Sequence, residues 1–305
     1  MTSSRLSPRT TGIIEILASG FCFGFLGLFG KTALAKGVSS FEFLAFRYLV
    51  AAAMMAIIVS VRAKRISALW LGGRTITRCL LLGLLGYAVF SSFYFLALER
   101  ISASMTVILL YMYPVFVAVG GAALFKERVP LNRLPALPMA FAGLVCLVWM
   151  DLQVGQTAGL IFGLLAAVFY SIYILLSSHW MKNSDAMAST FWIQLGAGIT
   201  LFAYSFTSIS RSAFVLQVAW LQIILIAFVC SVLAMWLFLS GLLKVQNWEA
   251  SLLSMAEPIT AVAVGVLILG ETLGALQWIG AALVLSALAL VSFPRRLKST
   301  AHGNT

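Results

Sequence analysis

ISASMTVILLYMYPVFVAVGGAALFKERVPL, residues 101–131, and QNWEASLLSMAEPITAVAVGVLILGETL, residues 246–273, share one skeleton. With a constant offset of 144, the matching pairs are Leu109 and Leu253, Pro114 and Pro258, Gly121 and Gly265, and Glu127 and Glu271. Each copy is an apolar helix with a proline in its middle and a glutamate at its end. An internal repeat of this length identifies the chain as two related halves.

The composition defines the class of protein. Hydrophobic residues make up 62% of the 305 residues, charged residues only 10%, and the mean hydropathy is +1.05. A soluble domain has about 25% charged residues, so this chain lacks the polar surface that water requires. The sequence predicts an all-α integral membrane protein.

Ten apolar spans follow one another, each near the roughly 20 residues that a helix needs to cross about 30 Å of hydrocarbon. Continuous apolar runs favour helices over the alternating pattern of barrel strands. The expected spans are 12–35, 40–61, 76–98, 102–125, 132–150, 157–179, 186–207, 217–243, 248–270 and 275–293. They divide into two five-helix repeats, 12–150 and 157–293, with an N-terminal segment 1–11 and a C-terminal tail 294–305.

The first span resembles a signal peptide, because Arg5 and Arg9 precede it and an A-x-A sequence lies near its end. Its apolar run is nevertheless far longer than the 7–15 residues of a signal peptide core. With an offset of 147 it also matches the sixth span, as in the pair Gly12 and Gly159. We therefore expect it to be a retained transmembrane helix.

The basic residues set the orientation. Five of the 20 Lys and Arg residues fall on the outer side if the N-terminus lies inside: Lys31, Lys36, Arg47, Arg100 and Arg211. The remaining fifteen fall on the inner side. This bias predicts that both termini are cytoplasmic. The net charge of +11 is then a topology signal, and we expect no nucleic-acid partner.

Five spans in each half is an odd number, so the second half must enter the membrane from the opposite side. Inverted repeats characterise many secondary transporters, whose substrate sites lie near the bilayer midplane between the repeats. Two similar halves can exchange conformations, which gives inward-open and outward-open states of comparable energy. The pattern predicts transport by alternating access.

These features carry a family resemblance. The ten spans, the proline-bearing fourth helix that ends in Lys126-Glu127-Arg128, and the end of the ninth at Gly270-Glu271-Thr272-Leu273 resemble the drug/metabolite transporter superfamily, and within it the EamA family. The second half is the more family-like, whereas Pro130, Pro135 and Pro138 depart from the family pattern in the first.

The resemblance implies a substrate class and a set of cavity-lining helices. Family members export or import amino acids, vitamins, drugs and other metabolites, and the YddG-like members make efflux of a neutral or aromatic amino acid the expected activity. We expect spans 1, 3, 4, 6, 8 and 9 to line the cavity and spans 5 and 10 to serve as scaffold. This assignment rests partly on the family resemblance. We expect a monomer in the cytoplasmic (inner) membrane, with lipid and a small molecule as partners and protons as a candidate coupling ion. The alternatives are uptake or exchange of a vitamin, nucleotide precursor or drug-like cation, and a membrane enzyme or signalling subunit.

Glu257 is the leading site candidate. It lies about ten residues into the ninth span, next to Pro258, where an ionisable group costs at least about 2.5–3.5 kcal/mol unless it faces a cavity or a partner. Proline opens the helix locally and frees a carbonyl. The carboxylate could bind a substrate ammonium or a proton. The structural alternative is a protonated glutamate that braces the kink inside the bundle. Its repeat partner is Tyr113, so the chemistry of the two halves differs.

Other charges inside the spans are open to two interpretations. Arg47 could bind a substrate carboxylate, but we favour the interpretation as a structural Arg that caps carbonyls of a neighbouring helix or reaches towards the interface. Glu15 and Glu249 fit helix N-termini, where the dipole favours carboxylates. Glu127 and Glu271 are expected to tie helix ends to loops.

Deep polar aromatic side chains suggest a lined cavity, since buried hydroxyls require partners. Packing against neighbouring helices is the alternative for each. Together with Ser254 in the ninth span, the candidate lining residues are Tyr87, Tyr94, Tyr113, Tyr170, Tyr173 and Trp236. Pro114, Pro258, Gly24 and Gly27 are candidate kink or gate positions; small residues in span one also permit close helix packing.

The sequence lacks the residue patterns that an enzyme active site or a metal site would require. Gly30-Lys31-Thr32 resembles the end of a P-loop, but Phe25 stands where the motif requires glycine. An intramembrane serine protease needs a buried His base, and the two histidines lie at a helix end and in the tail. The four cysteines are scattered without ligand spacing. We expect no enzyme activity, no metal and no cofactor.

Overall fold

The computed structural model describes residues 7–98, 100–101, 103–127, 129–149, 157–205, 209–269 and 274–292. Within these ranges all regular structure is helical. Nine helical segments are long and apolar enough to cross a membrane, and Ala136–Leu147 is a shorter tenth apolar segment. This confirms the prediction of an all-helical protein with ten apolar segments. The eighth starts earlier than predicted, because Ser210–Leu242 is one continuous 33-residue segment.

The described residues of the first half form ten helical elements, since several spans are broken. They are α1 (Pro8–Phe23), α2 (Leu26–Leu34), α3 (Ser40–Ala63), the 3₁₀ turn η1 (Ile66–Leu69), α4 (Gly73–Leu81), the π-helix η2 (Leu82–Ala88), α5 (Val89–Leu98), α6 (Ala103–Leu110), α7 (Tyr113–Phe125) and α8 (Ala136–Val148).

The second half repeats much of this order. Its elements are α9 (Thr157–Trp180), α10 (Ala186–Ser205), α11 (Ile209–Ile226), the π-helix η4 (Ala227–Leu233), α12 (Ala234–Leu242), α13 (Asn247–Leu253), α14 (Ala256–Leu269) and α15 (Ala275–Ser292). The third span of each half contains a seven-residue π-helix, and the two π-helices are 145 positions apart.

Local sequence explains the helix starts and breaks. Ser39 and Glu42 form a capping box at α3, in which the serine accepts from the Glu42 backbone and the glutamate from the Ser39 backbone. Pro114 and Pro258 lie in the first turns of α7 and α14, where a missing N–H is tolerated. The fourth and ninth spans therefore break just before their prolines.

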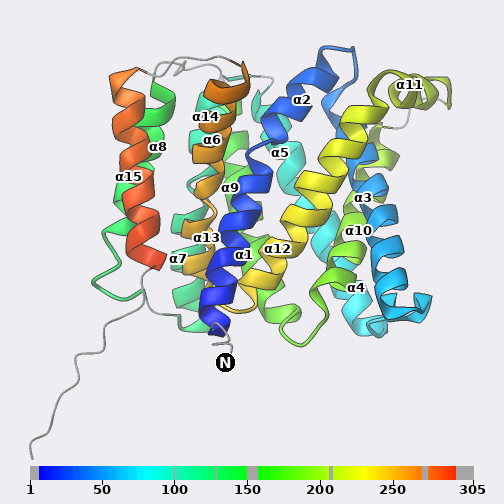
Figure 1. The fold of residues 1–305 in the computed structure, drawn as a ribbon, viewed down its shortest axis with the longest axis horizontal. Helices are drawn as coiled ribbons and strands as arrows, with labels where there is room; N and C mark the ends of the chain where they lie inside the picture. The colour runs from blue at the N-terminus through cyan, green and yellow to red at the C-terminus, as the bar shows by residue number, and fades with distance from the viewer. Residues whose placement is uncertain are drawn as a thin grey trace, which may run out of the picture.

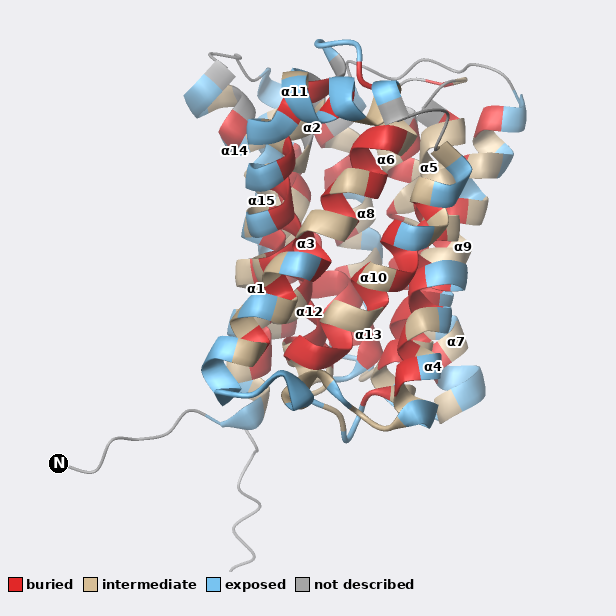
Figure 2. Cartoon of the chain, turned by 90° about the vertical axis from the view of Figure 1, so that its right-hand side faces the viewer, coloured by how far each residue is buried: buried red, intermediate tan, exposed pale blue. Residues whose placement is uncertain are grey.

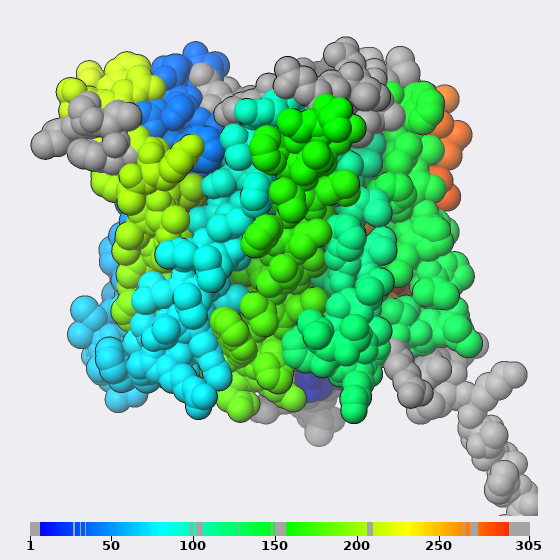
Figure 3. Space-filling view, turned by 180° about the vertical axis from the view of Figure 1, so that it is seen from behind, coloured from blue at the N-terminus to red at the C-terminus, as the bar shows by residue number. Residues whose placement is uncertain are grey.

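The helices form a bundle in which the two halves interleave (Figure 1). At one edge α8 packs on α15, and a Cβ added to Gly280 would lie 2.6 Å from the Gly143 carbonyl oxygen. Towards the other edge α3 packs on α10, while α5 lies beside α9 (Figure 3). Buried residues face the interior and exposed ones the rim (Figure 2). Because the exposed residues include many Leu, Ile, Phe and Trp, the rim suits lipid.

Candidate functional site

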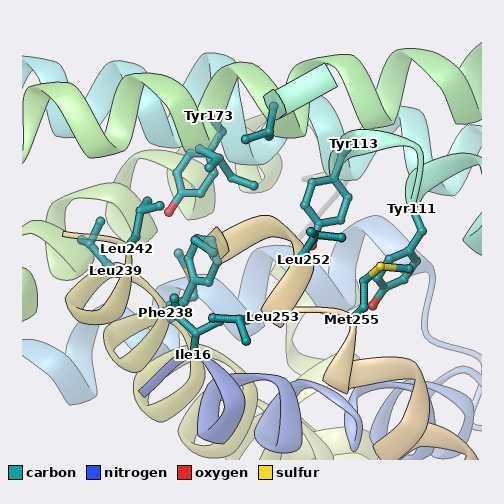
Figure 4. Close-up of a cluster of buried hydrophobic side chains, with 14 of the residues drawn as sticks. Ile16, Tyr111, Tyr113, Tyr173, Phe238, Leu239, Leu242, Leu252, Leu253 and Met255 are labelled. Carbon is teal, nitrogen blue, oxygen red and sulfur yellow. The ribbon is translucent and has the colours of Figure 1, made fainter. Parts of the chain in front are cut away.

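The two broken spans meet in the middle of the bundle. Tyr111 and Tyr113 extend from the break between α6 and α7 towards Leu252 and Met255 at the break between α13 and α14 (Figure 4). The Tyr113 hydroxyl donates to the Ser251 carbonyl oxygen at 3.0 Å. The helices of each half thus place equivalent irregular segments against each other.

A cavity of about 100 Å³ lies beside this junction. It receives side chains from spans 1, 2, 3, 4, 6 and 9. Its lining residues are Phe23, Leu26, Arg47, Tyr48, Tyr87, Phe90, Ser91, Tyr94, Phe95, Leu110, Tyr111, Tyr113, Tyr170 and Glu257. Six of the residues that the sequence singled out, namely Glu257, Arg47, Tyr87, Tyr94, Tyr113 and Tyr170, are therefore brought together.

Aromatic rings form a continuous wall of this cavity. Tyr87 packs edge-on against Tyr48, with ring centroids 5.5 Å apart, and against Phe90 at 5.0 Å. Tyr170 continues the series, 4.7 Å from Phe90 and 4.8 Å from Tyr113. Such offset and edge-to-face pairs favour a well-ordered apolar surface, which is suited to an aromatic or apolar ligand group.

Glu257 supplies the negative charge of the cavity. It stands in the first turn of α14, at the position that corresponds to Tyr113 in the other half. The Tyr111 hydroxyl is buried and interacts electrostatically with this carboxylate, but it has no hydrogen bond of regular geometry in this conformation. Both groups line the cavity. The Tyr111 hydroxyl and the Glu257 carboxyl group are therefore the polar groups that this side of the cavity presents to a ligand.

Arg47 supplies the positive charge. Its Nε donates to the Ser231 Oγ at 2.7 Å and its Nη2 to the Cys230 carbonyl oxygen at 3.2 Å. The guanidinium carbon lies 5.0 Å from the Tyr48 ring centroid. Among the described residues Arg47 makes no ion pair with Glu257. The cavity thus contains a guanidinium and a carboxyl group that do not contact each other directly.

Three predicted lining residues lie outside the cavity. Tyr173 is 1% exposed and lies behind the wall, where its ring stacks 6.0 Å from Tyr170 and contacts Tyr87 edge-on at 5.0 Å. Trp236 packs in a separate hydrophobic cluster with Met55. The Ser254 hydroxyl donates to the Ala250 carbonyl oxygen within its own helix.

The small residues of the first span lie at a close helix contact. Gly24 sits at the break between α1 and α2, and a Cβ there would lie 2.5 Å from the Thr260 Cβ of α14. Gly20 approaches Ala256 of the same helix in a similar way. Gly27 belongs to α2. The span that carries Glu257 is therefore in direct contact with the first span.

Sequence analysis missed several lining residues. Tyr48, Tyr111 and Ser91 all line the cavity, and the Tyr48 and Ser91 hydroxyl oxygens are 3.3 Å apart. Tyr48 follows Arg47 and Tyr111 precedes the break, so the same criterion, a polar aromatic deep in an apolar span, would have found both. The set of spans that line the cavity also differs from the prediction. Span 2 contributes lining residues, whereas span 8 contributes none and instead accepts hydrogen bonds from Arg47.

A second polar cluster lies at the end of the bundle where the N-terminus is found (Figure 1). A cavity of about 690 Å³ there is lined by Arg9, Arg133, Lys182, Lys244 and Glu249, among others. Glu15 binds Lys244, with Oε2 and Nζ 2.6 Å apart. Glu249 lies in the first turn of α13. Glu127 follows the end of α7 and accepts from the Asn247 backbone at the start of α13. Glu271 lies outside the described residues.

Across the described ranges no group of three or more His, Cys, Asp or Glu side chains lies together as a metal site would require. The four cysteines are free.

Family comparison identifies both halves. The sequence profile of the EamA-like transporter family matches residues 10–149 and again residues 157–293. An uncharacterised transporter of Archaeoglobus fulgidus is 32% identical over 211 residues, covering 68% of this chain and 75% of the relative. The uncharacterised transporter YcbK of Bacillus subtilis is 26% identical, with 97% of each chain covered.

One relative carries a more specific name. A probable amino-acid metabolite efflux pump of Salmonella typhimurium is 25% identical over 237 residues, covering 72% of this chain and 79% of the pump. A solved crystal structure superposes with a TM-score of 0.75 at 18% identity, covering 92% of this chain and 95% of the other. That likeness supports the fold.

Proposed function

This chain belongs to the EamA-like transporter family, and from that premise we propose that it exports neutral amino acids with apolar or aromatic side chains. The observation that carries the proposal is the presence of Arg47 and Glu257 in one aromatic-lined cavity without an ion pair between them. The membrane-spanning fold and the named transporter relatives make transport the activity class; the substrate is our inference.

An amino-acid zwitterion complements this cavity in charge and in polarity. Its carboxylate matches the Arg47 guanidinium, which forms strong charge-assisted hydrogen bonds with such groups. Its ammonium matches the Glu257 carboxylate. The side chain then meets the wall of Tyr87, Phe90 and Tyr170, where an aromatic ring gains favourable edge and face contacts. Binding of both charged ends lowers the cost of bringing the zwitterion out of water.

Alternating access is the mechanism that this cavity suggests. Its volume of about 100 Å³ is below the roughly 300 Å³ at which ligand pockets commonly begin. Substrate entry therefore requires the halves to separate on one side. The breaks before Pro114 and Pro258 are the natural hinge points, since they already interrupt the backbone hydrogen bonds of their spans.

Orientation and location follow from charge. Arg62, Lys64, Arg65, Lys182 and Lys244 all lie at or near the end of the bundle that contains the N-terminus, and the positive-inside rule assigns that end to the cytoplasm. We therefore propose that the chain resides in the cytoplasmic membrane with both termini inside. Export is the direction that the amino-acid metabolite efflux pump relative favours.

The decisive experiment is counterflow in liposomes that contain only the purified protein. Labelled phenylalanine should exchange with unlabelled internal phenylalanine in wild type and at most a few per cent as fast in Glu257→Gln. Glu15→Gln is the matched control, because it also removes a glutamate carboxylate from a transmembrane helix but lies outside the cavity, beside Lys244 at the end of the bundle. Absence of amino-acid exchange by folded wild type, or equal loss in both variants, would refute the proposal.

A second candidate substrate is an organic cation. Glu257 surrounded by aromatic rings resembles the cages that bind ammonium groups, and Arg47 is already held by Ser231 and Cys230. The same liposomes distinguish the two classes. Exchange of phenethylamine without exchange of phenylalanine would favour the cation.

A further inference from the structure

The π-helix η4 has a role that the cavity lining does not reveal. Its counterpart η2 delivers Tyr87 directly to the cavity. Among the described residues η4 contributes no side chain to the lining. It nevertheless contacts Arg47, which does line the cavity, through Ser231 and Cys230. Because π-helical turns are rare and concentrate at functional sites, a matched pair of them in the two halves points to a function for both.

Ser231 is the centre of the contacts that η4 makes. Its Oγ accepts from Arg47 Nε at 2.7 Å, and its carbonyl oxygen accepts from Gln194 Nε2 at 2.8 Å. The neighbouring Cys230 carbonyl accepts from Arg47 Nη2. All of these groups are buried: Ser231 and Gln194 are 0% exposed and Arg47 is 3% exposed. The guanidinium therefore has a fixed position rather than a range of rotamers.

The repeat symmetry strengthens this interpretation. Arg47 and Gln194 are 147 positions apart, the offset that also relates the first and sixth spans, and they lie on the paired helices α3 and α10. Equivalent positions in the two halves thus converge on one residue of η4. Gln194 donates a hydrogen bond to the Ser231 carbonyl oxygen, and the Ser231 hydroxyl oxygen accepts one from Arg47.

The arrangement determines which guanidinium atoms remain for a ligand. Nε is used by Ser231 and Nη2 by Cys230, while within the described ranges no hydrogen bond engages Nη1. Arg47 also lines the cavity. Since a guanidinium is planar and its donors are rigidly arranged, anchoring one edge fixes the direction in which the remaining donors point.

We propose that Ser231 is a positioning residue that makes the cavity selective for a carboxylate by orienting Arg47. This inference rests on the proposed amino-acid transport. It predicts that loss of the Ser231 hydroxyl weakens binding of ligands with a carboxylate and leaves ligands without one unaffected, because only the former use Arg47.

Competition measurements test this selectivity. Unlabelled phenylalanine and phenethylamine, which share a ring and an amine but differ in the carboxylate, are titrated against labelled phenylalanine counterflow in wild type and Ser231→Ala. The half-inhibiting concentration of phenylalanine should rise roughly tenfold in the variant, as expected for one hydrogen bond to a charged group. The value for phenethylamine should not change. Ser231→Thr retains a hydroxyl and should restore most of the wild-type preference.

Two further variants separate positioning from structure. Ser19→Ala is the matched control, because the Ser19 hydroxyl is also buried and donates to the Ala234 carbonyl at 2.7 Å just beyond η4; it should shift neither ligand. In an Arg47→Lys background the Ser231→Ala change should have no additional effect on phenylalanine. If Ser231→Ala fails to fold, Ser231→Cys, which preserves volume but is a weak acceptor, takes its place.

The outcomes discriminate between the two proposals. Equal shifts for both ligands, or no shift for either, would overturn the role of Ser231 while amino-acid transport stands. An additive effect in the Arg47→Lys background would also overturn it. A wild type that transports no amino acid refutes the proposed function first, and the inference with it.

Discussion

Arg133 and Glu249, one from each half of the chain, form a buried ion pair with Nη1 and Oε1 2.8 Å apart. Arg9 donates to the same carboxylate oxygen from α1, at 2.7 Å from Nη2. Glu249 also accepts from the Gln246 backbone as part of the capping box of α13. One carboxylate therefore ties three segments together at the end of the bundle where the N-terminus lies.

Replacing this carboxylate should destabilise the protein. Glu249→Gln removes the negative charge from the buried ion pair with Arg133, whose side chain is 9% exposed, and breaking a buried pair costs about 3–5 kcal/mol. The free energy of unfolding in detergent should fall by about 3 kcal/mol. Arg9→Gln is the comparison: its side chain is 33% exposed, so its loss should cost much less. Equal losses in both variants would contradict the importance of burial.

The opposite end of the bundle has a corresponding tie between the halves. Arg211 of α11 binds Glu42 of α3, with Nε and Oε1 2.7 Å apart, and also donates to the Gly37 carbonyl. If alternating access operates, Glu249→Gln should favour opening of the N-terminal end and Glu42→Gln opening of the other. Each variant removes one inter-half carboxylate, so each is the control for the other.

Thiol labelling measures this difference. Ser91→Cys, introduced where the four native cysteines have been replaced, places a thiol in the cavity wall. An impermeant reagent applied from the N-terminal side should react several-fold faster in Glu249→Gln than in the parent, and more slowly in Glu42→Gln. Acceleration from the same side in both variants would show that the ion pairs only stabilise the fold.

Close packing between the halves makes Gly83 sensitive to substitution. A Cβ on Gly83 of η2 would overlap the Ile193 carbonyl oxygen of α10 and lie 2.8 Å from the Ala197 nitrogen. Gly83→Ala should lower the free energy of unfolding by about 1–3 kcal/mol, because the helices must separate. In Gly30→Ala the added methyl group would have no atom of another described helix within 4 Å, and a better helix former should stabilise by up to about 1 kcal/mol. Thermal unfolding of the two variants measures this difference in stability. A Gly83→Ala variant that is as stable as wild type would contradict the prediction.

Much of the fold could be predicted from the sequence, because its signals are local. Apolar length defines the spans, and the prolines at 114 and 258 predict the breaks because they cannot donate a helical hydrogen bond. The π-helices could not be predicted. Their geometry depends on tertiary partners such as Arg47, which bonds to the Cys230 carbonyl from another helix.

The sequence could predict which residue types form the candidate site, but not fully which of their side chains point into the cavity. Glu257 and Arg47 stand out because charge inside a span is costly, and the structure brings both to the cavity. Trp236 stands out equally by depth, yet it packs near Met55. In a helix that is apolar all round, periodicity carries no information about which face turns inward. Tertiary contacts decide which face of such a helix points towards the cavity.

Glu127 should give the protein a pH-dependent stability. It lies just beyond the fourth span and accepts from the Asn247 backbone at 3.2 Å and side chain at 2.7 Å. Desolvation by burial raises the pKa of its carboxyl, repulsion from Glu249 adds to this, and the hydrogen bonds only partly oppose it. The folded protein therefore retains this proton to higher pH than the unfolded chain does.

The sign of the effect follows from proton binding. Between the ordinary glutamate pKa of 4.5 and the raised pKa in the fold, the native state binds more protons, so stability falls as pH rises through this window. The contribution is fully present below the window and lost above it. The unfolding free energy of wild type minus that of Glu127→Gln should therefore decrease from acid to neutral pH. A difference that grows with pH would mean that the hydrogen bonds from Asn247 outweigh desolvation and that the fold favours the carboxylate form. A constant difference would mean that the two effects cancel; either result contradicts the prediction.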